Sequence, residues 1–109
     1  MRGYRRIPAG DLDSIRRAIW QGAPVVFGLV VRESFLDWDG TGVIDQDSGS
    51  IAGGHAMCLT GYAPSVFTGP NSWGPSWGAG GFFTFSADRM RLATDIWVAD
   101  FDPDRGGSA

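Results

Sequence analysis

The longest apolar run of this sequence constrains the fold more than any other feature. It covers Ala23–Val31, which is about half the length that a membrane-spanning helix requires, so we expect no membrane span. After Pro24, the segment Val25–Val31 is apolar at the positions of both faces of a strand. A strand of this kind has to be covered on both sides, which predicts a place in the middle of a sheet.

The segments around this strand predict further short strands and one flanking helix. Asp11–Gln21 is predicted to be helical, because apolar residues recur there at helical spacing. Asp11 or Asp13 can cap the start of this helix, and Gly22 ends it. Its apolar face consists of Leu12, Ile15 and Ile19. The other segments are assigned as strands (55–62, 82–85 and 95–101), as loops (34–51, 63–70 and 71–81) and as at most two helical turns (89–93).

The length of 109 residues suits one small domain. We divide it into an N-terminal arm over residues 1–10, the domain itself over 11–101 and a polar tail over 102–109. Met1–Arg6 is basic, but no apolar segment follows it, so we expect no secretory signal peptide in this chain and assign no compartment.

The charge of the chain argues against nucleic-acid binding. Nine basic residues, all arginine, stand against twelve acids, which gives a net charge of -3. An acidic domain is poorly suited to bind a phosphate backbone. The sequence also has no glycine-rich phosphate loop of the dinucleotide or Walker kind.

The chain has a single cysteine, Cys58, and a single histidine, His55. This excludes an internal disulfide and any multi-cysteine metal site, and it makes His55 the expected group for acid–base chemistry near neutral pH. In a strand His55 shares a face with Met57 and Leu59, whereas Cys58 points to the other face. A nucleophilic thiol must lie about 3 Å from its base. We therefore expect Cys58 to be a small, buried apolar residue and not a nucleophile.

Two runs of aspartates supply carboxylates of the kind that bind calcium. Neither has the glycine and glutamate placement of an EF-hand loop, so we expect solvated loop acids, no metal and no cofactor. The runs are Asp37, Asp39, Asp45 and Asp47, and Asp100, Asp102 and Asp104.

Two further segments carry a recognisable pattern. They read Gly53-Gly54-His55-Ala56-Met57-Cys58-Leu59-Thr60-Gly61-Tyr62 and Asn71-Ser72-Trp73-Gly74-Pro75-Ser76-Trp77-Gly78. Together they strongly resemble the papain-like cysteine peptidases, whose signature is a Gly-His-Ala…Gly-Tyr strand followed by an Asn-Ser-Trp-Gly-x-x-Trp-Gly turn. The similarity covers about Ile7–Val98, and the bacterial branch of the family looks closest.

The resemblance implies an α+β fold, namely the β-rich second lobe of a two-lobed enzyme, with an antiparallel, β-barrel-like sheet and one flanking helix. In this family the first lobe carries the nucleophilic Cys, and the second carries His and Asn. By this resemblance His55 is the general base and the partner of the thiolate, and Asn71 holds the imidazole by its side-chain oxygen. Trp73 shields that hydrogen bond from water, Trp77 packs beside the leaving-group side of the cleft, and Gly54 is a further supporting residue.

These residue types suit that chemistry. An imidazolium strongly lowers the pKa of a neighbouring thiol, so the thiolate persists at neutral pH. A neutral amide orients the imidazole without burying a charge.

The chain also departs from the family pattern. Nothing in it resembles the Gln…Cys-Trp segment, which supplies the oxyanion donor and the nucleophile, so we expect no peptide hydrolysis by this chain alone. Pro70 stands where the family often has Lys or Arg, and the 63–70 connection is short. Both departures raise the question of whether Asn71 is displaced from His55.

Three functional hypotheses follow, of which the last is a truncated chain or gene relic with no activity of its own. In the first, the chain is half of a cysteine peptidase, which acts on a peptide substrate when another chain supplies the Cys-bearing lobe. In the second, it is a non-catalytic binding or structural module, held by self-association or by neighbours in a larger assembly such as a virion or a secreted complex. In that case His55 is a core histidine, and Asn71 and Trp73 only form and pack the turn.

Overall fold

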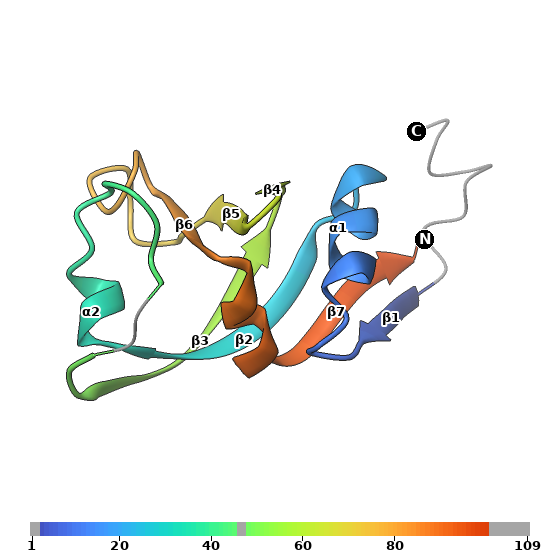
Figure 1. Ribbon diagram of the computed structural model, residues 1–109, viewed down its shortest axis with the longest axis horizontal. Coiled ribbons are helices and arrows are strands. Elements are labelled where there is room, and N and C mark those ends of the chain that lie inside the picture. The colour runs from blue at the N-terminus through green and yellow to red at the C-terminus, as the bar shows by residue number, and fades with distance from the viewer. Residues whose placement is uncertain (1–2, 46–47, 101–109) are drawn as a thin grey trace.

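The computed structural model describes residues 3–45 and 48–100, which form two antiparallel sheets and three short helices (Figure 1). The first sheet has the strand order β1-β7-β2-β3, and the second has the order β4-β5-β6. Together with the short helices, this gives the α+β, mainly antiparallel fold that was expected, although the sheets do not close into a barrel. The elements are β1 (Gly3–Ile7), α1 (Leu12–Trp20), β2 (Val25–Arg32), α2 (Glu33–Leu36), β3 (Ile51–Leu59), β4 (Gly61–Ala63), β5 (Val66–Pro70), β6 (Phe82–Ser86), the 3-10 helix η1 (Ala87–Leu92) and β7 (Thr94–Asp100).

Strand β2 lies inside the first sheet, between β7 and β3, as its apolar sequence predicts. Its burial on both faces was predicted wrongly. Val26 is 46% exposed and Val30 is 53% exposed, because no other layer of the described chain covers that face. The opposite face packs into the core through Val25, Phe27, Leu29 and Val31.

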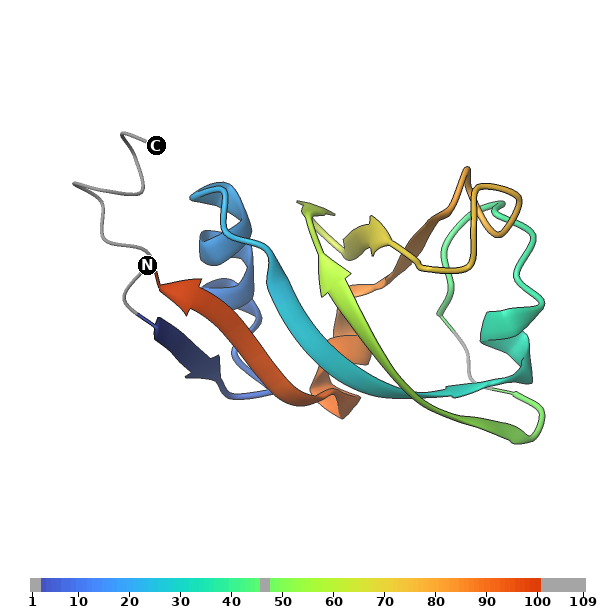
Figure 2. The same ribbon diagram turned by 180° about the vertical axis from the view of Figure 1, so that it is seen from behind.

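The core fills the space between the two sheets and beneath α1 and η1. Its centre is aromatic, and neighbouring rings meet edge to face or stacked, which is the favoured geometry of such pairs. Figures 1 and 2 show the long, curved strands β2 and β3 crossing the molecule below the second sheet. The fully buried phenylalanines are Phe27, Phe35, Phe67, Phe83 and Phe85.

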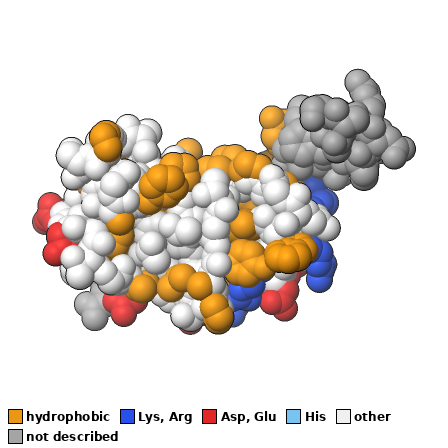
Figure 3. All heavy atoms as spheres, turned by 90° about the horizontal axis from the view of Figure 1, so that it is seen from above, with side chains coloured by type: hydrophobic (Ala, Val, Ile, Leu, Met, Phe, Trp, Pro, Cys, Tyr) orange, Lys and Arg blue, Asp and Glu red, His pale blue; other side chains and the backbone are white. Residues whose placement is uncertain are grey.

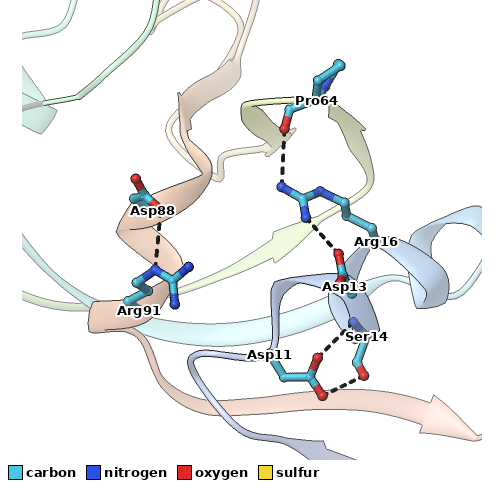
Figure 4. Close-up of polar contacts among 7 residues, drawn as sticks. All are labelled: Asp11, Asp13, Ser14, Arg16, Pro64, Asp88 and Arg91. Atoms are coloured by element: carbon cyan, nitrogen blue, oxygen red, sulfur yellow. Dashed lines mark hydrogen bonds and ion pairs between the residues drawn. The ribbon is translucent and has the colours of Figure 1, made fainter.

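Helix α1 forms where it was expected. Asp11 caps it by accepting a hydrogen bond from the backbone N–H of Ser14, and bonds to Ser14 lower the pKa of this carboxyl. Gly22 follows the helix with a positive φ of 86°. Arg16 joins the helix to the β4–β5 turn, since its guanidinium bonds both Asp13 and the carbonyl of Pro64 (Figure 4). In the described part of the chain no helix is long and apolar enough to cross a membrane.

Four segments differ from the sequence-based assignment. The 34–51 segment, assigned as a loop, begins with helix α2. The N-terminal arm contains strand β1, which pairs with β7 along its whole length. The 63–70 connection, taken as a loop, contains β5, the middle strand of the second sheet. The predicted strand 55–62 is divided at Thr60, because β3 belongs to the first sheet and β4 to the second. The polar tail over 102–109 lies outside the described residues.

Candidate functional site

The candidate site begins with His55, in the middle of β3. Its backbone pairs with Leu29 of β2, and its side chain is half-buried at the edge of the core. Met57 and Leu59, two and four residues further along the strand, are buried in the same core. The imidazole is therefore held by the strand that also anchors the core.

Asn71 lies beside His55, although sixteen positions separate them in the sequence. The Oδ1 atom of Asn71 is 3.0 Å from Nε2 of His55, and it also accepts a 2.7 Å hydrogen bond from the backbone N–H of Ser72. A backbone N–H can only donate, which identifies Oδ1 as an acceptor. In the neutral imidazole Nε2 must then carry the hydrogen, and the lone pair of Nδ1 remains available.

The position of Asn71 depends on how closely β5 approaches β3. A Cβ atom at Gly69 would overlap the carbonyl oxygen of Cys58 on β3 and would lie 3.0 Å from the ring of Phe83. Because glycine leaves that space free, β5 ends directly beside the strand that bears His55. The short connection and Pro70 therefore do not displace Asn71.

Trp73 and Trp77 lie on the turn that connects β5 to β6. The indole of Trp73 stacks on the imidazole of His55, with ring centroids 4.8 Å apart and planes 15° apart. Trp77 meets Trp73 edge to face, with ring centroids 5.1 Å apart. Among the ring contacts of the site, Trp73 therefore lies between Trp77 and His55. One face of the imidazole is thus covered by an aromatic side chain.

Gly54 contributes less to this geometry than the other site residues predicted from the sequence. It is exposed, pairs with Val30, and a Cβ atom at this position would contact nothing within 4 Å. Its role stays a prediction.

Comparison with known proteins shows the family of this chain. The family model described as papain family cysteine protease matches residues 1–97. The chain belongs to the papain family of cysteine proteases. It is 38% identical over 97 residues to the uncharacterized peptidase C1-like protein L477 of Acanthamoeba polyphaga mimivirus, and 35% identical over 77 residues to cathepsin B-like cysteine proteinase 6 of Caenorhabditis elegans.

These matches cover 80% and 67% of this chain but only 31% and 20% of the two relatives. Among solved structures, xylellain, a cysteine protease from Xylella fastidiosa, matches with a TM-score of 0.74 and 28% identity. That match covers 91% of this chain and 40% of xylellain. The chain thus spans less than half the length of these family members.

The cysteine of this papain-family chain does not take part in the site. Cys58 lies three residues beyond His55 along β3 and pairs with Val26 of β2. Its thiol is 3.8 Å from the carbonyl oxygen of Leu59. Burial raises the pKa of the Cys58 thiol, which disfavours the nucleophilic thiolate.

We therefore predict slow alkylation of Cys58. At about pH 8 iodoacetamide should modify the folded chain about tenfold more slowly than the chain unfolded in denaturant, because both the thiolate fraction and its access are reduced. The rate is measured by mass spectrometry over time. Equal rates in the folded and unfolded chain would contradict both the burial and the raised pKa of this thiol.

The aspartates do not assemble into a cation site in the described part of the chain. Within residues 3–45 and 48–100 no three His, Cys, Asp or Glu side chains come close enough together to hold a metal ion. Asp47, Asp102 and Asp104 lie outside the described residues.

Sequence reasoning assigned no role to two neighbours of the turn, Phe35 and Leu36. Phe35 of α2 is fully buried and stacks on Trp77 at 5.4 Å, and the carbonyl of Leu36 accepts a 3.0 Å hydrogen bond from Nε1 of Trp77. Only the apolar spacing of the segment hints at such burial, and nothing local indicates a partner forty-one positions away.

Proposed function

We propose that this chain is the His- and Asn-bearing lobe of a papain-like cysteine peptidase, and that it hydrolyses peptide bonds once a Cys-bearing lobe outside these 109 residues faces it. The observation that carries the proposal is the bond from Nε2 of His55 to Oδ1 of Asn71, since it leaves Nδ1 as the proton acceptor. Within the family we place the chain in the bacterial branch, and the likeness to xylellain supports this.

The reaction follows from that arrangement. Nδ1 of His55 takes the proton of the incoming thiol, and the thiolate attacks the peptide carbonyl carbon. The C–N bond breaks as the same nitrogen returns the proton to the leaving amine, which leaves an acyl-thioester. Nδ1 then takes a proton from water, the hydroxide attacks the thioester carbonyl and the C–S bond breaks. Nδ1 returns its proton to the departing thiolate, which regenerates the thiol, and the carboxylic acid product loses its proton to water. The donor that stabilises the oxyanion comes from the other lobe in this proposal.

The amide of Asn71 supports a functional interpretation of the pair. Its Oδ1 receives two hydrogen bonds, whereas Nδ2 is buried without a partner among the described residues. An unsatisfied buried donor costs about 1–3 kcal/mol. The side chain keeps this orientation because two hydrogen bonds hold its Oδ1, and one of them fixes the imidazole.

The open face of the first sheet supports docking of a second lobe. Val26 and Val30 of β2 are exposed there, and they flank Gly28, which pairs with the exposed Ala56 of β3. Figure 3 shows the other side of the molecule, where α1 and the second sheet lie, and hydrophobic side chains reach the surface there in several places. We propose that the Cys-bearing lobe covers the apolar side chains on the open face of β2 and β3 and reaches around β3, the edge strand of the sheet, to His55, whose side chain lies on the opposite face.

The proposal is tested by inserting this chain into a known two-lobed enzyme. The matching region of xylellain is replaced by residues 1–100 of this chain, and the rest of xylellain supplies the cysteine. We expect the chimera to hydrolyse a fluorogenic peptide and to be labelled by E-64, the inhibitor bound in the solved bromelain complex. A folded chimera that neither hydrolyses the peptide nor reacts with E-64 would contradict the proposal and favour the non-catalytic module.

A further inference from the structure

We infer that Trp77 is a positioning residue that fixes the orientation of His55 through two separate connections, one along aromatic rings and one along the backbone of the 71–81 turn. The effect of Trp77 on the orientation of the imidazole is a property of the isolated chain. Its consequence for catalysis rests on the proposed function.

Trp73 alone cannot fix the imidazole firmly. Trp73 is 37% exposed, and it lies on an irregular turn outside the described strands and helices. Stacking on His55 therefore orients the imidazole only if another group holds Trp73 in place. Both figures of the ribbon show this turn at the same end of the molecule as α2.

The aromatic connection supplies that support. Trp77 and Phe35 both meet Trp73 edge to face, at 5.1 Å and 5.9 Å. Phe35 is fully buried and stacks on Trp77 at 5.4 Å, so the support ends in the hydrophobic core. The bond from Nε1 of Trp77 to the carbonyl of Leu36 fixes the rotation of its indole against α2.

The backbone connection runs to Asn71. The carbonyl of Trp77 accepts a 2.8 Å hydrogen bond from the N–H of Gly81, and the carbonyl of Gly81 accepts another of 2.8 Å from the N–H of Asn71. Trp77 is thus linked both to the ring that stacks on His55 and to the residue that bonds His55. A shift of Trp77 should move both contacts together.

The presence of one histidine makes this measurable by NMR. Long-range 1H–15N spectra of the chain, recorded where the imidazole is neutral, report the fraction of the Nε2–H tautomer, and cross-relaxation reports the His55–Trp73 stack. Trp77→Phe keeps an aromatic ring but loses the bond to Leu36, and Trp77→Ala loses both. Trp20→Ala is the matched control, because Trp20 is 79% exposed on α1.

We expect Trp77→Phe to lower the Nε2–H fraction measurably and the His55–Trp73 cross-relaxation several-fold, with no change in Trp20→Ala. If Trp77→Ala does not fold, Trp77→Phe decides the question. Wild-type values in a folded Trp77→Phe chain would overturn the inference and leave the proposed function intact. An unmodified chain without the Nε2–H tautomer would instead contradict the proposed function.

Discussion

His55→Ala in the xylellain chimera is expected to reduce peptide hydrolysis about 1,000-fold or more, because the thiol then loses its proton acceptor and the leaving amine loses its proton donor. The chain has no second histidine that could take over either step. Initial rates with a fluorogenic peptide measure the effect, and the rate of E-64 labelling should fall in parallel.

Two further variants of the chimera accompany this experiment: Asn71→Ala tests the orienting residue, and Cys58→Ser is the control. Asn71→Ala should lower kcat by about 10- to 100-fold. The imidazole is still present in this variant, but no hydrogen bond from residue 71 holds it in its productive orientation. Cys58→Ser should leave hydrolysis unchanged, because Cys58 does not contact the site. Hydrolysis that survives in His55→Ala, or that disappears in a folded Cys58→Ser chimera, would contradict the assignment of roles.

Gly69→Ala is expected to destabilise the isolated chain by about 3 kcal/mol or more. The added methyl group would overlap the carbonyl oxygen of Cys58, and backbone atoms cannot move aside as a flexible side chain can. β5 would have to move away from β3, which would also separate Asn71 from His55. Urea unfolding followed by tryptophan fluorescence gives the free energy of unfolding.

The matched control for this prediction is Gly54→Ala on β3. A Cβ atom there meets nothing within 4 Å, so the free energy of unfolding should change by less than about 0.5 kcal/mol. If Gly69→Ala were as stable as Gly54→Ala, the close approach of the two strands would not determine the position of Asn71.

Local sequence patterns predicted the parts of the fold that local physics determines. Helix α1 follows from apolar spacing, from the capping residue Asp11 and from Gly22, all within twelve residues. The central place of β2 follows from its apolar run. The segments that were assigned differently depend on partners far along the chain, since β1 is a strand only because β7 offers an edge to it.

The candidate site was predicted from motifs, and its geometry was not. Spacing places His55 on a strand and Asn71 on a turn, but it does not bring them together. Their contact depends on Gly69 fitting against the backbone of β3, and the role of Trp77 depends on Leu36. Contacts between distant segments of this kind leave no periodic signal in a sequence.

The most direct test of the account is the tautomer of the lone imidazole in the isolated chain. A neutral ring with its hydrogen on Nε2, which shifts toward the Nδ1–H form in Asn71→Ala, is the result that a preformed half of an active site predicts. A ring with its hydrogen on Nδ1 in the unmodified chain would contradict it, because that nitrogen could not then accept a proton from a thiol.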